Sequence, residues 1–167
     1  VPRVFGRPRS MAARGWRAKY DVEPLRATLF DHFGQTTLGG LQKQVCVTAL
    51  RVDGKASVNT SPEVYPTQQT GFWRPAVFTN MPAVPGVTPD VDLSCVDACL
   101  RSSAAPTFFP IHDGYADGGL WANNPSTVAL AKTLLHFPGL RRTDVKILSI
   151  GTGQWRNAVV TAQPDLG

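Results

Sequence analysis

Residues 101–125 read RSSAAPTFFPIHDGYADGGLWANNP, and this stretch decides the fold that we expect. Because a residue preceding a proline is driven out of the α region, a helix entering from the N-terminal side must end before Pro106. Asp117 is followed by two glycines, Gly118 and Gly119, which permit backbone angles and close contacts that other residues would forbid. The sequence therefore predicts a rigid turn that presents the Asp117 carboxylate, with the two glycines supporting it.

Three helices are predicted, two of them on either side of this turn. Residues 92–105 show helical spacing of apolar side chains and lead into the turn. Residues 125–135 follow it with a proline at the first helical position, and Asn123 or Asn124 is placed to cap that helix. Nearer the start of the chain, apolar residues recur at three- and four-residue steps over 21–33. The central turn thus connects two helices.

Short apolar runs between the helices predict a sheet. Residues 45–50 and 145–150 are typical of strands buried on both faces of a parallel or mixed sheet, and a brief strand is expected at 76–79. Strands alternating with helices indicate an α/β fold, with helices on both faces of a mostly parallel sheet. The Gly-Thr-Gly sequence at 151–153 would then turn at the carboxyl end of a strand, where ligand sites form preferentially.

Composition indicates one globular domain. The chain has 167 residues, 43% of them hydrophobic and 17% charged, which is enough for a single domain with its own core. The net charge is +5, and seven basic residues fall in the first 26 positions. We interpret residues 1–18 as an irregular basic lead-in, residues 19–154 as the domain and residues 155–167 as a tail.

The basic start favours anionic partners only weakly. Trp16 and Tyr20 interleave with arginine and lysine there, but an isolated charge run is usually solvated surface, so no nucleic-acid partner is expected. An anionic membrane surface stays open as a partner, and the oligomeric state is not set by the sequence. No run approaches the roughly 20 apolar residues of a membrane span, and no secretory signal is visible. We expect a cytoplasmic or peripheral membrane protein.

The three cysteines, Cys46, Cys95 and Cys99, are interpreted as core thiols. They form an odd set without paired spacings, as is typical of reduced intracellular proteins. Cys95 and Cys99 are one helical turn apart, but no histidine or further cysteine completes tetrahedral spacing around them. We therefore expect neither a metal nor another cofactor.

His112 is the only histidine near Asp117 in the sequence. A glycine turn lies between the two residues, so their side chains could meet, but a packed or surface histidine is favoured over a catalytic base. His32 and His136 fall late in predicted helices, where a polar or positive side chain suits the helix dipole.

The chain resembles the patatin-like phospholipases, lipid acyl hydrolases of α/β fold that use a serine and an aspartate in place of a triad. The resemblance spans roughly 19–153, and its clearest blocks are Ser-Ser-Ala-Ala-Pro-Thr-Phe-Phe-Pro (102–110), Asp-Gly-Gly (117–119), Asn-Asn-Pro (123–125) and Ser-Ile-Gly-Thr-Gly (149–153). It implies that Asp117 is the dyad aspartate, which would orient or deprotonate the serine that attacks a lipid ester carbonyl.

Two motifs of that family have no counterpart in the sequence. The nucleophile elbow Gly-x-Ser-x-Gly and the glycine-rich oxyanion segment are both missing. Ser149 is not a substitute, because position 147 is isoleucine where the elbow needs glycine. Other serines without flanking glycines are interpreted as helix-end or capping residues: Ser102, Ser103 and Ser126.

Since the family places both missing motifs before the region matched, the resemblance implies an N-terminally incomplete domain, with 19–154 as its later part. We expect a fragment of a serine-aspartate dyad hydrolase that releases fatty acid from a lipid ester, with little activity as this chain alone. The alternative is a non-catalytic patatin-like module that binds lipid or a partner protein. The lipid headgroup is open under both hypotheses.

Overall fold

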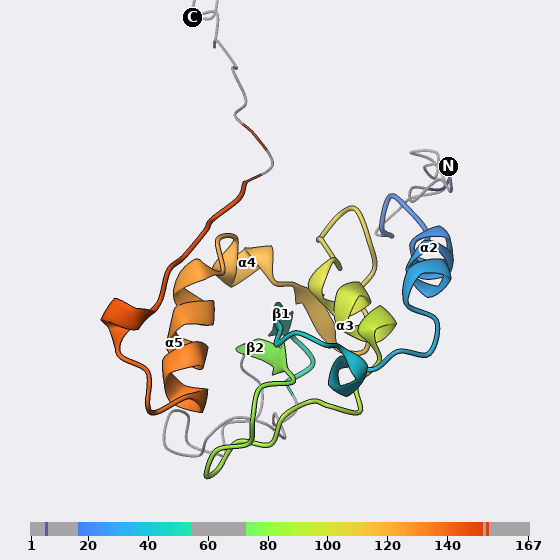
Figure 1. Ribbon diagram of the computed structural model, residues 1–167. Coiled ribbons are helices and arrows are strands. Elements are labelled where there is room, and N and C mark those ends of the chain that lie inside the picture. Colours follow the sequence, from blue (N-terminus) through green and yellow to red (C-terminus); the bar gives the residue numbers. More distant parts are fainter. Residues whose placement is uncertain (1–5, 7–16, 55–72, 152, 154–167) are drawn as a thin grey trace, which may run out of the picture.

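The fold is described from a computed structural model, for residues 6, 17–54, 73–151 and 153. Figure 1 shows helices on either side of a small sheet. The helices and strands, in chain order, are α2 (Glu23–Phe33), β1 (Cys46–Arg51), β2 (Arg74–Thr79), α3 (Cys95–Ser102), β3 (Tyr115–Asp117), α4 (Gly119–Ala122) and α5 (Ser126–His136). Two short 3-10 helices are also present, η1 (Leu38–Gly40) and η2 (Arg142–Asp144).

Within the described residues, the sheet has three strands in the order β2-β1-β3, and β1 is antiparallel to both neighbours. The α/β class is therefore confirmed, but the expectation of a mostly parallel sheet is wrong. That expectation rested on the alternation of predicted strands, at 45–50 and 145–150, with predicted helices. Strand β3, which pairs with β1, has only three residues. It is too short to show a two-residue periodicity in the sequence.

Residues 145–150 do not form the strand that their apolar pattern predicts. They run beside α5 and away from the sheet (Figure 1). Leu148 and Ile150 are 84% and 82% exposed, and the segment pairs with none of the strands β1, β2 and β3. Ser149 is exposed as well, which corrects its assignment to a buried strand. Of the Gly-Thr-Gly turn at 151–153, the middle residue lies outside the described residues.

The helices follow their sequence signals closely. Helix α2 ends where predicted, at a C-cap Gly34 with a φ of +52°, a backbone angle that favours glycine. Helix α3 is shorter than expected. It begins after Ser94, whose Oγ accepts a hydrogen bond from the Asp97 amide at 3.0 Å, and it ends well before Pro106.

Helix α5 begins at Ser126, so Pro125 precedes the first helical residue instead of occupying it. Neither candidate cap occupies the N-cap position, which is Pro125 and has no side-chain cap hydrogen bond, so the capping prediction is wrong. The Oδ1 of Asn124, one residue earlier, accepts hydrogen bonds from the amide and the hydroxyl of Ser126. The other candidate, Asn123, lies at the end of α4.

A small core lies between α3 and the sheet. Phe78 of β2 and Tyr115 of β3 meet edge to face across β1, with ring centroids 5.2 Å apart. The buried cluster around them contains Leu38, Ala49, Ala76, Cys95 and Ala98. Helix α2 packs on α3, so the N-terminal part of the described chain is held to the sheet through α3.

The cysteines behave as core thiols. All three are free, Cys95 is buried, and Cys46 and Cys99 are half-buried. Burial raises the pKa of each thiol above its usual value, so little thiolate is present near neutral pH.

In the described part of the chain, no three His, Cys, Asp or Glu side chains gather as a metal site would require. No helix among these residues combines the length and the apolar character needed to cross a bilayer.

Candidate active site

Asp117 is the last residue of β3, opposite Ala49 of β1. Its amide donates a hydrogen bond to the carbonyl oxygen of Ala104 at 3.1 Å. The next amide, of Gly118, donates to the carbonyl of Ser102 at 3.2 Å. The turn is thus fixed both to the sheet and to the end of α3, as the sequence predicts for a rigid presentation of this carboxylate.

The Asp117 carboxylate is held by one of its two oxygens. Oδ1 accepts a hydrogen bond from the Gly119 amide at 2.6 Å, across the turn that starts α4. Within the described residues, Oδ2 accepts no hydrogen bond. The side chain is half-buried, which leaves part of the carboxylate accessible.

Gly118 is required for a different reason than its backbone angle. Its φ of −62° suits any residue, but a Cβ at this position would lie 2.2 Å from the carbonyl oxygen of Thr48 and 2.4 Å from the Thr48 Oγ1. A Cβ on Gly119 would lie 3.1 Å from the Asp117 Oδ1. Both glycines therefore serve close approach, one to the backbone of β1 and the other to the carboxylate.

Trp121 anchors the short helix α4, and sequence reasoning did not single it out. Its indole Nε1 donates a hydrogen bond to the carbonyl oxygen of Ala49 at 2.8 Å. Ala49 is also the residue opposite Asp117 in the sheet. A tryptophan four residues after the aspartate, in the stretch GGLWANN at 118–124, was the available signal.

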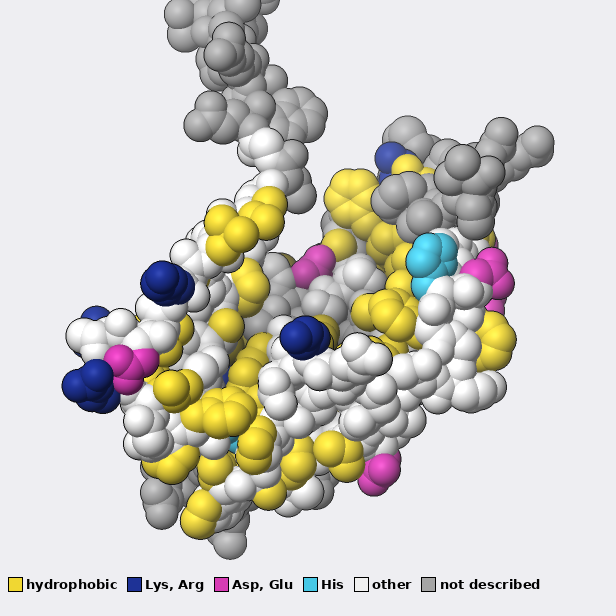
Figure 2. All heavy atoms as spheres, viewed as in Figure 1, with side chains coloured by type: hydrophobic (Ala, Val, Ile, Leu, Met, Phe, Trp, Pro, Cys, Tyr) yellow, Lys and Arg dark blue, Asp and Glu magenta, His cyan; other side chains and the backbone are white. Residues whose placement is uncertain are grey.

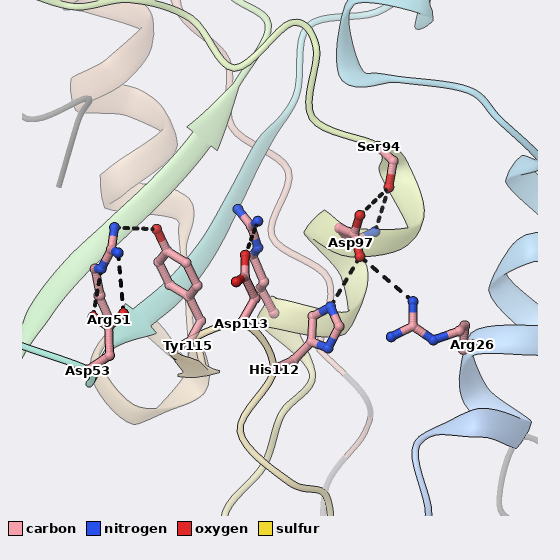
Figure 3. A network of polar contacts seen from close by, with 9 residues as sticks. Arg26, Arg51, Asp53, Ser94, Asp97, His112, Asp113 and Tyr115 are labelled. Atoms are coloured by element: carbon pink, nitrogen blue, oxygen red, sulfur yellow. Dashed lines mark hydrogen bonds and ion pairs between the residues drawn. The ribbon is translucent and has the colours of Figure 1, made fainter. Parts of the chain in front are cut away.

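His112 does not meet Asp117. Figure 3 shows its ring beside Asp97 of α3, where Nε2 lies 3.1 Å from Oδ1. The same carboxylate faces Arg26 of α2, with 3.8 Å between Nη1 and Oδ1, and it accepts a hydrogen bond from the Ser94 hydroxyl. His112 is therefore a packed histidine that ties the loop before β3 to α3, as favoured from the sequence.

This network alters the acidity of Asp97. Partial burial opposes the ionised form, but hydrogen bonds from His112 and Ser94 and the nearby positive charge outweigh it and lower the pKa of Asp97 below 3.8. The carboxylate is thus ionised over the physiological range and holds the two helices and the loop together.

The other two histidines and Ser103 also have structural partners. The buried His136 meets the Pro82 carbonyl, with 2.6 Å between Nδ1 and the oxygen. His32 lies with its Nδ1 2.9 Å from the Thr28 carbonyl. The Ser103 hydroxyl donates to the Cys99 carbonyl at 2.7 Å, a helix-end contact of the kind predicted. Among the described residues, no serine hydroxyl forms a hydrogen bond with the Asp117 carboxylate.

A cleft of about 690 Å³ lies between α5 and the segment after η2. In Figure 2 that segment forms a column beside a separate hollow in the surface. The wall of the cleft starts at the corner between α4 and α5 and includes Asn123, Asn124, Cys46, Leu130 and Ile147. Asp117 is not among its lining residues.

A family model described as patatin-like phospholipase matches residues 3–130. This match covers more than half of the chain, and the chain belongs to the patatin-like phospholipase family.

Curated relatives include three bacterial proteins named cGAMP-activated phospholipase. The protein of Vibrio cholerae is 34% identical over 164 residues, covering 90% of this chain and 40% of the relative. The Escherichia coli protein is 36% identical over 143 residues, covering 80% of this chain and 35% of the relative. The Pseudomonas aeruginosa protein is 29% identical over 157 residues, covering 90% of this chain and 41% of the relative. The chain thus spans about two fifths of the length of these relatives.

Replacing Gly118 by alanine should destabilise the fold, because the new Cβ would collide with backbone and side-chain atoms of Thr48. We expect the free energy of unfolding to fall by about 2 kcal/mol or more, as for overpacked sites. Urea denaturation followed by circular dichroism measures this. Gly139→Ala is the matched control, since nothing lies within 4 Å of a Cβ there. Equal stability of the two variants would contradict the close approach.

Asp97 should make stability depend on acid pH. A carboxyl whose pKa is lowered by folding stabilises the protein above its unfolded-state pKa, and this contribution is lost as the pH falls through the folded-state value. The difference in urea midpoint between the unsubstituted chain and Asp97→Asn should therefore be largest near pH 7 and shrink below pH 3.8. Asp31→Asn, at an exposed position of α2, serves as the control. A difference that grows in acid would contradict the assignment.

Proposed function

We propose that Asp117 is the carboxylate of a serine-aspartate dyad in a lipid acyl hydrolase, and that residues 19–154 are the later part of its catalytic domain. The observation that supports this most is the asymmetric hold on the carboxylate. Oδ1 is fixed by the Gly119 amide at 2.6 Å, whereas Oδ2 has no hydrogen-bond partner in the described part of the chain. A fixed carboxylate with one oxygen accessible can accept a hydrogen bond or a proton from a serine hydroxyl.

In the proposed reaction the serine oxygen attacks the ester carbonyl carbon while its proton passes toward Asp117. The bond from the acyl carbon to the alcohol oxygen then breaks as Asp117 passes that proton to the departing oxygen, and a neutral alcohol leaves. Water next attacks the acyl-serine while giving a proton to Asp117, which returns it to the serine oxygen as fatty acid is released. The substrate class is a lipid ester of phospholipid type, with the headgroup open. Because such a substrate resides in a bilayer, an anionic membrane surface is part of the proposal.

The nucleophile and the oxyanion donors are proposed to lie outside these 167 residues, in the complete protein. The sequence contains no Gly-x-Ser-x-Gly, and the chain covers 40% of the Vibrio cholerae relative. Without its nucleophile a hydrolytic site retains only a small fraction of its rate. We therefore expect little fatty acid release from this chain alone.

Asp117→Asn in the complete protein should lower phospholipid hydrolysis by about a hundredfold or more, within the range by which general acid-base groups contribute. The amide keeps the shape of the side chain but cannot take up the serine proton. Fatty acid release from phospholipid vesicles is the measurement. Asp113→Asn is the matched control, because Asp113 pairs with Arg101 before β3 and its φ of +50° is tolerated by asparagine. Full activity of Asp117→Asn would exclude the dyad role.

The alternative function, a non-catalytic lipid- or protein-binding module, follows from the missing nucleophile. The same assay separates the two hypotheses. If the complete protein releases no fatty acid from any lipid ester class and Asp117→Asn changes nothing, the binding module is the better description.

The three bacterial relatives support a further proposal about control. All are named as cGAMP-activated, and they match at 29% to 36% identity. We expect phospholipid hydrolysis by the complete protein to rise at least about tenfold on addition of cGAMP, which corresponds to a coupling free energy of about 1.4 kcal/mol. AMP at equal concentration is the control. Equal activity with and without cGAMP would reject the proposed activation by cGAMP. The dyad proposal would not be affected.

A further inference from the structure

The loop that leads to Asp117 also carries an exposed aromatic patch. Phe108 and Ile111 are 48% and 60% exposed, and the ring of Tyr20 stacks on Phe108 with 6.4 Å between centroids. Lys19 Nζ lies 5.3 Å from the Tyr20 ring centroid and 5.7 Å from that of Phe108. We call Lys19, Tyr20, Phe108 and Ile111 the aromatic patch.

The patch is held in place by the backbone. The amides of Lys19 and Tyr20 donate hydrogen bonds to the carbonyl oxygens of Thr107 and Phe108, at 2.8 and 2.9 Å. Thr107 has a φ of +69°, an angle that a β-branched residue rarely adopts. Two distant segments of the chain thus fix a strained turn that keeps Phe108 at the surface.

The patch is connected to Asp117 through a short stretch of backbone. The Ala105 carbonyl accepts hydrogen bonds from the Phe108 and Phe109 amides, and the preceding Ala104 carbonyl accepts the one from the Asp117 amide. In Figure 2 hydrophobic side chains gather over this part of the surface, on the same face as the hollow. A surface bound through the patch would therefore lie close to the candidate catalytic carboxylate.

We propose that the aromatic patch docks the protein on an anionic phospholipid bilayer. This inference rests on the proposed function, since a lipid ester must be reached from the bilayer surface. Phenylalanine and isoleucine partition into the acyl boundary, tyrosine favours the headgroup level, and a lysine can bury its stem while its ammonium meets lipid phosphates.

The charges around the patch make anionic lipid the preferred occupant. Lys19 lies over the rings of the patch itself and Arg17 is exposed two residues before it, whereas Glu23 at the start of α2 already pairs with Arg26 at 3.6 Å. Asp21 is the other acidic residue nearby along the chain. Attraction to anionic headgroups is therefore modest, and apolar insertion supplies most of the binding.

The test is co-sedimentation of the chain with vesicles containing phosphatidylglycerol. Exchanging both exposed apolar residues of the patch, Phe108→Ser with Ile111→Ser, should lower the partition coefficient about tenfold or more, as loss of two buried apolar side chains implies. The matched control is Phe30→Ser with Leu135→Ser, two residues each 49% exposed on α2 and α5. Equal binding of the two double variants, or no binding by the unsubstituted chain, would overturn the proposal.

A second measurement, fluorescence quenching, tests the proposal even if the double serine variant of the patch misfolds. Fluorescence of the Phe108→Trp variant should be quenched by brominated lipids more strongly than that of Phe30→Trp, and equal quenching would overturn the proposal. Asp117→Asn should sediment with vesicles like the unsubstituted chain. Because sedimentation does not report fatty acid release, failure of the patch and failure of the dyad give different results.

Discussion

The described structure depends on the close approach of Gly118 to Thr48. The backbone after β3 passes so near β1 that a Cβ would lie 2.2 Å from the Thr48 carbonyl oxygen. This contact lets a strand of only three residues end against the sheet and turn at once into α4. The indole Nε1 of Trp121 donates a hydrogen bond to the Ala49 carbonyl oxygen at 2.8 Å and so holds α4 against β1. The position of Asp117 is a consequence of these two contacts.

A carboxylate positioned in this way loses little entropy when it acts. Its main chain is bonded to Ala104, and one carboxylate oxygen is bonded to Gly119, so the side chain is oriented before any partner arrives. The same backbone continues into the aromatic patch, where the Thr107 and Phe108 carbonyls are held by Lys19 and Tyr20. The candidate carboxylate and the proposed membrane contact are thus parts of one rigid loop, supported by the Asp97 network beneath it.

The sequence predicted the features of this fold that depend on neighbouring residues, such as helix ends and tight turns. Gly34 stopped α2, Pro106 limited α3, and the Asp-Gly-Gly turn presents its carboxylate as expected. Pairing between distant segments could not be predicted in this way. The apolar pattern of 145–150 is that of a buried strand, but burial needs a partner strand, and the segment pairs with none in the described sheet. The hydrogen bond from Trp121 to Ala49 and the stacking of Tyr20 on Phe108 join positions too far apart in sequence for any periodicity to reveal.

The central claim is that Asp117 serves a serine that lies outside these residues. Labelling the complete protein with a fluorophosphonate, followed by mass spectrometry of its peptides, tests that claim most directly, because the reagent marks an activated serine without needing the natural lipid. We predict one labelled serine, located outside residues 1–167, with labelling slowed when Asp117 is replaced by asparagine. A label on Ser102, Ser103, Ser126 or Ser149, or labelling that ignores Asp117, would contradict the claim.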